Sequence, residues 1–143
     1  MKCYLTKADP NKWRMLDYLR KVQSGTIELP DWWSEVCEDV EPGDTLFIGI
    51  EGPDGGIYAK ATIISPPYSD TPDDEFYVNL EDLSERLGAY IDIKSFQNLI
   101  DRPILESKLM EIPALGRVAK WLHVEGSRLK LTGEECEALN KLI

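Results

Sequence analysis

The sequence has little of what most enzymes use for nucleophilic or metal-assisted catalysis. Its 143 residues include one histidine and three cysteines. Nucleophilic triads and most transition-metal sites depend on imidazole, and the chain has no Gly-x-Ser-x-Gly elbow, phosphate-binding loop or zinc motif. We interpret the single histidine, His123, as a structural or surface residue. We expect no enzymatic activity, no catalytic residue, no cofactor and no metal site.

The cysteines and the apolar runs exclude further classes of protein. Cys3, Cys37 and Cys136 form no Cys-x-x-Cys pair and are odd in number, which favours reduced thiols over a disulfide framework. No apolar run approaches the length of a membrane span, and the first residues are too charged for a signal peptide. We expect a cytoplasmic protein without a membrane partner, folded as a single domain over residues 1–143.

The charge of the chain is acidic but unevenly distributed. The formal net charge is −10, which argues at first against nucleic acid, because phosphate binding uses clustered Lys and Arg. Residues 1–24 carry +4, however, and residues 25–87 carry −14. A fold that brings the two ends together would present a moderately positive face on an acidic body. Ordinary surface charge explains the same distribution equally well.

A β-hairpin is the clearest local structure in the sequence. Pro42-Gly43-Asp44 predicts a turn, and a second turn from Gly52 to Gly56 separates two alternating apolar runs. Side chains at every second position of a strand share one face. The pattern places on one face of each strand the residues Leu46, Ile48 and Ile50, followed by Ile57, Ala59, Ala61 and Ile63.

The other elements are short. The pattern predicts strands at 2–6, 76–80, 88–93 and 127–132, and helices at 11–22, 82–87 and 105–110. Asp9 before Pro10 predicts the N-cap of the first of these helices. A last helix follows Thr132-x-x-Glu135, which has the form of a capping box. Residues 26–39 have no regular period. Five or six strands with inserted helices indicate the α+β class and a small open barrel.

Aromatic residues suggest a binding surface. Two of the four tryptophans, Trp32 and Trp33, are adjacent in the segment without periodicity. Adjacent residues in an extended segment face opposite sides, so at most one of the two indoles can enter the core. An exposed indole is a natural surface for stacking a base. Packing of both rings under a loop is the equal alternative.

The order of several short motifs resembles that of the EVE domain, a PUA-like domain related to YTH and ASCH domains. The matching segments run from about residue 2 to residue 143. They are Asp9-Pro10-Asn11-Lys12-Trp13, Trp33-Ser34, Pro42-Gly43-Asp44, Gly56-Ile57-Tyr58-Ala59-Lys60-Ala61, Ser65-x-Pro67-Tyr68, Tyr90-Ile91-Asp92-Ile93, Arg102-Pro103-Ile104-Leu105 and Trp121 before Gly126-Ser127.

The resemblance implies a PUA-like β-barrel with flanking helices that holds a modified DNA or RNA base in an aromatic cage. On this basis Trp33 is the best match for one cage wall and Trp121 for the second, with Trp32 as the competitor of Trp33. Further ligand-binding candidates are Tyr4, Lys7, Ser34, Tyr90 and Asp92 at the pocket or its rim, and Arg117 and Arg128 as phosphate contacts. A partner nuclease or another protein is left open as an additional partner.

A function of a different class fits the same composition. The acidic middle of the chain would suit a protein-interaction or regulatory accessory module that docks on a basic partner. Loss of the pocket tryptophans would abolish binding by a base reader and would leave binding by such a module intact.

Overall fold

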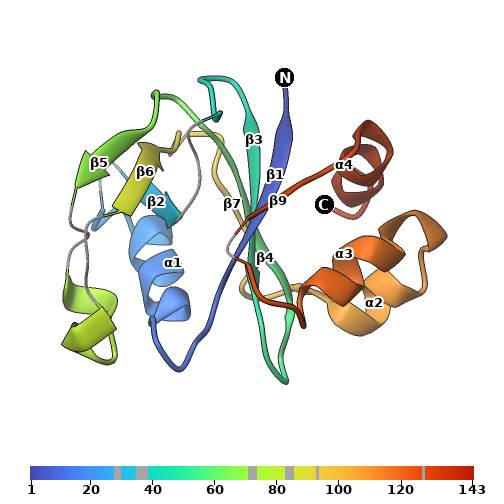
Figure 1. Ribbon diagram of the computed structural model, residues 1–143, viewed down its shortest axis with the longest axis horizontal. Helices are drawn as coiled ribbons and strands as arrows, with labels where there is room; N and C mark the ends of the chain where they lie inside the picture. The colour runs from blue at the N-terminus through green and yellow to red at the C-terminus, as the bar shows by residue number, and fades with distance from the viewer. Residues whose placement is uncertain (28–29, 35–38, 71–73, 83–85, 93, 127) are drawn as a thin grey trace.

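The computed structural model describes residues 1–27, 30–34, 39–70, 74–82, 86–92, 94–126 and 128–143. A central sheet separates α1 and a small sheet on one side from three helices on the other (Figure 1). The helices are α1 (Met15–Gln23), α2 (Glu106–Met110), α3 (Gly116–Trp121) and α4 (Gly133–Asn140). The strands are β1 (Cys3–Ala8), β2 (Asp31–Ser34), β3 (Thr45–Ile50), β4 (Gly56–Thr62), β5 (Tyr68–Asp70), β6 (Arg86–Tyr90), β7 (Gln97–Asn98), β8 (Ile104–Leu105) and β9 (Arg128–Lys130).

The strands form two sheets that meet at one point. The six-stranded sheet has the order β7-β4-β3-β1-β9, with β8 also paired to β4, and β1 and β3 are parallel. The small sheet has the order β2-β6-β5. A bridge between Ile63 and Ile91 connects the two sheets. This confirms the α+β class and a sheet of six strands, but the pairs among the described residues do not close into a barrel.

The predicted hairpin is present as β3 and β4, with one change of face. Leu46, Ile48 and Ile50 lie together in one core cluster, as predicted, and Ala59 packs with them. Ile57 lies in a different cluster, on the other face of the sheet. The reason is a bulge between Ile48 and Gly49, which shifts the register so that Tyr58 has no direct partner on β3. A bulge inserts one residue and reverses the faces beyond it.

Two hydrophobic clusters hold the layers together. Cluster 1 lies between the central sheet and α1 with the small sheet, and cluster 2 lies between the central sheet and α2, α3 and α4 (Figure 1). Strand β1 serves both clusters, because Tyr4 faces cluster 1 and Leu5 faces cluster 2. Both of these side chains are fully buried. Burial on both faces is typical of a central strand, and in β1 it extends to the polar Thr6 and the charged Lys7.

Several sequence-based predictions are wrong at the level of single elements. The first helix starts at Met15, because the Asp9 carbonyl accepts from the backbone N–H groups of Lys12 and Trp13 in a turn, so Asp9 is not its N-cap. Residues 74–76 and 80–82 form 3-10 turns, so no strand covers 76–80. Strand β2 and helix α3 were not predicted. The predicted helix at 82–87 is wrong at its described end, because residues 86–87 belong to β6. Residues 83–85 lie outside the described residues, as does Cys37.

The C-terminal helix begins as predicted. The Thr132 hydroxyl accepts from the Glu135 backbone N–H at 3.1 Å, and the Glu135 carboxylate accepts from the Thr132 backbone N–H at 2.9 Å. Two N–H groups at the helix start are satisfied in this way. No helix in the described part of the chain combines the length and the apolar character needed to span a membrane.

The cysteines correct another expectation. Cys3 and Cys136 form a disulfide that joins β1 to α4, where reduced thiols were predicted. The two residues are 133 positions apart in the sequence, and their approach depends on the packing of α4 against cluster 2. Spacing rules read only neighbouring cysteines and therefore do not detect such a pair.

Candidate functional site

Lys7 is the most unusual charged residue in the described part of the chain. It lies near the end of β1, and its side chain is only 2% exposed. Its ammonium group donates to the backbone carbonyl of Trp121 at 2.6 Å and to that of Val124, and it lies 3.6 Å from the Glu51 carboxylate. Burial lowers the pKa of Lys7, and the negative charge of Glu51 opposes this shift. Hydrogen bonds and an ion pair therefore compensate a cation that is largely removed from water.

Trp121 lies directly beneath this ammonium group. The Lys7 nitrogen is 4.3 Å from the centre of the indole ring, a cation–π contact. Gly126, at a φ of +132°, passes so close that a Cβ there would lie 3.6 Å from the indole Nε1. Trp121 itself is 8% exposed and packs in cluster 2 with Leu5 and Val118. The structure thus brings together two of the predicted site residues, Lys7 and Trp121, in a mostly buried contact.

A groove of about 990 Å³ opens above Lys7. Three segments form it: the connection from β1 to α1, the turn of the β3–β4 hairpin, and residues 122–126 after α3. Its acidic side chains outnumber its basic ones, so a bare phosphate would meet an unfavourable field. The charged and titratable lining residues are Asp9, Glu51, Asp54 and Glu125 on one hand, and Lys7, Lys12 and His123 on the other.

His123 has a partner at the edge of this groove. Its Nε2 lies 2.6 Å from a Glu106 carboxylate oxygen, which links the segment after α3 to α2. Sequence reasoning gave His123 a structural or surface role, and this hydrogen bond agrees with that interpretation. Glu51 was not singled out from the sequence, since its importance depends on the buried Lys7 across the groove.

The small sheet carries the other group of predicted site residues. Strand β2 runs antiparallel to β6. Its register partners on β6 are Ala89 for Trp32, Gly88 for Trp33 and Leu87 for Ser34. Only the backbone of β2 is described. On the other side of β6, β5 pairs with it so that Tyr68 is also opposite Gly88. Positions 33 and 68 therefore flank Gly88, a residue without a side chain, from both sides.

Tyr90 is the last residue of β6, and Asp92 lies two residues beyond it. The Tyr90 ring stacks on Tyr68, with ring centres 4.9 Å apart and planes inclined by 28°. Asp92 accepts from the Lys94 backbone N–H at 2.9 Å and from the Ser95 hydroxyl at 3.0 Å, so it stabilises a local turn. The stacked tyrosines form a half-buried aromatic surface next to β2. Tyr68 was part of a matched motif, but its stacking could not be inferred from the sequence.

Tyr4 and Arg128 meet at Asp39, beside β1 and β9. The Tyr4 hydroxyl lies 3.3 Å from the Asp39 carboxylate, and the Arg128 guanidinium forms an ion pair with the same carboxylate. The guanidinium carbon is also 4.9 Å from the centre of the Tyr4 ring. Hydrogen bonding from Arg128 lowers the pKa of Asp39. Arg128, predicted to contact phosphate, is thus already paired with a carboxylate.

Arg117 is likewise engaged. Its Nε donates to one Glu135 carboxylate oxygen at 2.9 Å and its Nη2 to the other at 2.5 Å, while Nη2 also reaches the Lys130 carbonyl at 3.0 Å. This bidentate pair holds α3 against the start of α4. Hydrogen bonding from Arg117 lowers the pKa of Glu135, which is buried.

This pair predicts a dependence of stability on pH. A carboxyl group whose pKa is lower in the folded state stabilises the fold above its unfolded pKa, and this contribution is lost as the pH falls through the folded pKa. Glu135→Gln retains a side chain that can cap the helix but removes the charge. We expect the wild-type protein to lose more unfolding free energy than Glu135→Gln between about pH 6 and about pH 3.

Urea denaturation at both pH values measures this difference. The exposed neighbour substitution Glu134→Gln is the matched control, and it should behave like the wild type. Equal losses in the wild type and in Glu135→Gln would show that the ion pair with Arg117 contributes nothing to the acid sensitivity.

The predicted site residues therefore fall into separate places. Lys7 and Trp121 lie on the cluster 2 side of the central sheet, whereas β2, with positions 32–34, belongs to the small sheet on the cluster 1 side (Figure 1). Tyr90 lies close to β2 through the pairing of Tyr90 with Asp31. That Trp33 and Trp121 form two walls of one cage stays a prediction, and the burial of Trp121 favours a structural role for its ring.

Solved structures with the same fold are identified by comparison of the whole chain. No protein-family model and no curated protein matches the sequence. Protein PSPTO5229 of Pseudomonas syringae superposes with a TM-score of 0.66 at 16% identity, over 98% of both chains. Human THYN1, in a crystal structure with DNA containing 5-methylcytosine, gives 0.64 at 14% identity, over 99% of this chain and 97% of that one.

An ASCH protein of Zymomonas mobilis gives a TM-score of 0.61 at 14% identity, over 99% of both chains. At these identities the likeness establishes the fold. The chain has the PUA-like fold that its motif order predicts, and it shares this fold with THYN1 and with the ASCH protein.

Proposed function

We propose that this protein is a non-enzymatic nucleic-acid-binding module that reads a modified base of DNA or RNA through an aromatic pocket. The observation that carries the proposal is the likeness of almost the whole chain to human THYN1, whose structure was solved with DNA containing 5-methylcytosine. The acidic character of the chain agrees with weak binding of bare nucleic acid, because phosphate contacts supply most sequence-independent affinity. Recognition would then depend on one extruded base held by rings and polar groups.

The small sheet is the better of the two places for this pocket. Trp33 and Tyr68 are both register partners of Gly88, on strands that lie on either side of β6. Directly opposed positions of antiparallel strands share one face of the sheet, and strands once removed are about 10 Å apart. That spacing would admit one flat base between positions 33 and 68, and because Gly88 is buried the neighbouring side chains must move apart for the base to enter. Tyr90 is two residues beyond Gly88 and shares the face.

The register also favours Trp33 over Trp32 as the reading residue. Trp32 pairs with Ala89, and Ala89 is buried in cluster 1. Position 32 thus belongs to the face that meets the core, and position 33 to the opposite face. By the same alternation position 34 shares the face of position 32, so Asp92, which follows Tyr90, is the better of the two polar candidates near the base. Lys7 with Trp121 forms the second, more buried candidate place.

Alanine substitutions separate these possibilities. We expect Trp33→Ala to weaken binding of a modified oligonucleotide by about 1–3 kcal/mol, the cost of losing one stacked base. Trp32→Ala is the matched control, because it removes the same ring from the adjacent position. Fluorescence anisotropy with a labelled oligonucleotide gives both affinities. A loss confined to Trp32→Ala would exchange the two assignments, and unchanged affinity in Trp33→Ala, Trp32→Ala and Trp121→Ala would refute the aromatic pocket.

A second candidate function has support from the pairing of the arginines. Arg117 and Arg128, the residues predicted to contact phosphate, are paired with Glu135 and Asp39. A chain that carries −10 and neutralises these cations internally would suit a regulatory module that docks on a basic protein, such as an associated nuclease. Such binding would weaken at high salt and would be unaffected by Trp33→Ala.

A further inference from the structure

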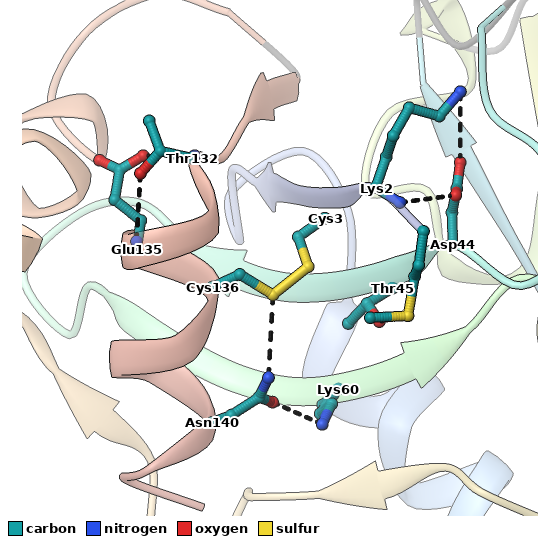
Figure 2. The surroundings of a disulfide bond; sticks show 10 residues. Lys2, Cys3, Asp44, Thr45, Lys60, Thr132, Glu135, Cys136 and Asn140 are labelled. Atoms are coloured by element: carbon teal, nitrogen blue, oxygen red, sulfur yellow. Dashed lines mark hydrogen bonds and ion pairs between the residues drawn. A yellow bond between two sulfur atoms is a disulfide. The ribbon is translucent and has the colours of Figure 1, made fainter.

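The Cys3–Cys136 disulfide fastens the first strand to the last helix. Cys3 begins β1 and Cys136 lies in the second turn of α4, so the bond closes nearly the whole chain into a loop. Figure 2 shows the two sulfur atoms between α4 and the strands of the central sheet. Both cysteines belong to cluster 2, and they are 7% and 6% exposed.

The disulfide borders a pocket that opens to solvent. Both cysteines line a surface pocket of about 420 Å³, together with Met1, Gly133, Glu137, Asn140 and Lys141. Gly133 contributes no side chain, and a Cβ there would meet nothing within 4 Å. Met1 is 89% exposed and leaves that side of the pocket open to water. The volume lies in the range of pockets that hold small molecules, and a thiol of low molecular weight is small enough to enter.

The two sulfur atoms are not equivalent. The Asn140 side-chain amide donates to the Cys136 sulfur at 3.8 Å, and the Lys60 ammonium donates to the Asn140 carbonyl oxygen at 2.5 Å (Figure 2). Lys60 therefore orients and polarises the amide that faces Cys136. A donor at one sulfur stabilises the negative charge that develops there when the bond breaks, and the better stabilised thiolate leaves faster. This arrangement makes Cys136 the leaving group and Cys3 the sulfur that is attacked.

We infer that this pocket is a thiol-exchange site at which a low-molecular-weight thiol, such as a cysteine-containing peptide, reduces the Cys3–Cys136 disulfide. The thiolate of the small thiol forms a bond to the Cys3 sulfur, and the electron pair of the disulfide passes to the Cys136 sulfur, which takes up a proton. A second small thiolate then attacks the small-molecule sulfur of the mixed disulfide. Cys3 leaves as a thiolate and takes up a proton, and the two small molecules depart joined by a disulfide. Two small thiols are oxidised to one disulfide while the protein disulfide is reduced.

Reduction should loosen α4 without unfolding the protein. The capping box of Thr132 and Glu135 and the bidentate pair of Glu135 with Arg117 hold the start of α4 without the disulfide. Leu139, farther along α4, is fully buried in cluster 2. Reduction should therefore lower the stability of the fold without removing its other contacts. A cross-link stabilises mainly by restricting the unfolded chain, and a long loop such as this one restricts it most.

The experiment uses the full chain carrying Cys37→Ser, which removes the third thiol. Reduced glutathione is added to the native protein, samples are quenched with acid, and mass spectrometry locates the adduct. We expect a one-glutathione adduct on Cys3, a reduction rate proportional to the glutathione concentration, and a lower urea midpoint for the reduced protein. Asn140→Ala should slow reduction about fivefold, as expected for one lost hydrogen bond. Lys141 lines the same pocket and pairs with Glu137, and Lys141→Ala should change the rate much less than Asn140→Ala does.

Two results would overturn the inference. A reduction rate that does not depend on the glutathione concentration and equals the rate of global unfolding would mean that the pocket gives no access to the sulfur atoms. An adduct on Cys136 in place of Cys3, with no effect of Asn140→Ala, would refute the assigned direction of attack. These outcomes are independent of nucleic-acid binding, because the inference rests on the disulfide and its pocket alone.

Discussion

Replacing Trp121 with alanine should lower the free energy of unfolding by about 3–5 kcal/mol, the usual cost of removing a buried aromatic side chain. The indole is 8% exposed and packs with Leu5 and Val118 in cluster 2. Its loss also removes the ring under the Lys7 ammonium, a cation that is already largely withdrawn from water. The cavity and the weakened environment of Lys7 act in the same direction.

Trp121→Phe is the matched control for this substitution. It keeps an apolar ring in the cavity and a face toward Lys7, so we expect it to cost markedly less than Trp121→Ala. Urea denaturation followed by circular dichroism gives both values. A Trp121→Ala protein that keeps nearly full stability but loses oligonucleotide binding would contradict the structural role and would favour the predicted role as a cage wall.

The second large effect is expected at Gly56, the first residue of β4. Gly56 pairs with Leu105 of β8, and the Gly55 carbonyl accepts from the Glu106 backbone N–H at 3.0 Å. A Cβ at position 56 would overlap the Ile104 carbonyl oxygen and would lie 2.9 Å from the Leu105 Cα. Both neighbours are backbone atoms, which cannot rotate away. We expect Gly56→Ala to cost about 3 kcal/mol, at the upper end of typical overpacking.

Gly116→Ala provides the control for the Gly56 substitution. Gly116 begins α3, and a Cβ there would have open space around it. We expect this change to be neutral or to stabilise by up to about 1 kcal/mol, because alanine favours the helix and restricts the unfolded chain. Denaturation midpoints of the two variants should therefore move in opposite directions or differ widely. Equal midpoints would mean that β8 does not approach Gly56 as closely as the structure indicates.

The elements that the sequence predicts correctly are those fixed by local interactions. The capping box at Thr132 and Glu135 and the turn at Gly43 depend on residues within one turn of each other, and both are present. Gly43 adopts a φ of +96°, as a turn glycine is expected to do. The hairpin of β3 and β4 is similar, because its two strands are adjacent in the sequence.

The elements that the sequence misses depend on contacts between distant segments. Strand β2 has no period of its own and exists through its pairing with β6, more than fifty residues later. The face of Ile57 is reversed by a bulge next to Gly49, and a glycine inside a strand indicates either a bulge or a close backbone approach without deciding between them. The Cys3–Cys136 bond likewise requires β1 and α4 to meet in space.

The candidate site shows the same division. The residue types were available from the sequence, and the motif order led to the PUA-like fold. The sequence did not reveal the environment of each site residue. Lys7 was expected at a pocket or its rim, but its side chain is almost fully buried. Arg128 was expected to contact phosphate, but it is paired with Asp39. Burial and pairing are properties of the assembled sheet, because β1 is enclosed by β3 and β9.

A protein that reads a modified base must distinguish that base from its unmodified form. The most direct test measures its affinity for two oligonucleotides that are identical except for one cytosine, which carries a 5-methyl group in one of them. We expect the modified oligonucleotide to bind about tenfold tighter, because one extra methyl group in a fitted apolar pocket contributes about 1–3 kcal/mol, and we expect Trp33→Ala to abolish this difference. Equal affinity for modified and unmodified oligonucleotides across a panel of base modifications, in DNA and in RNA, would contradict the account.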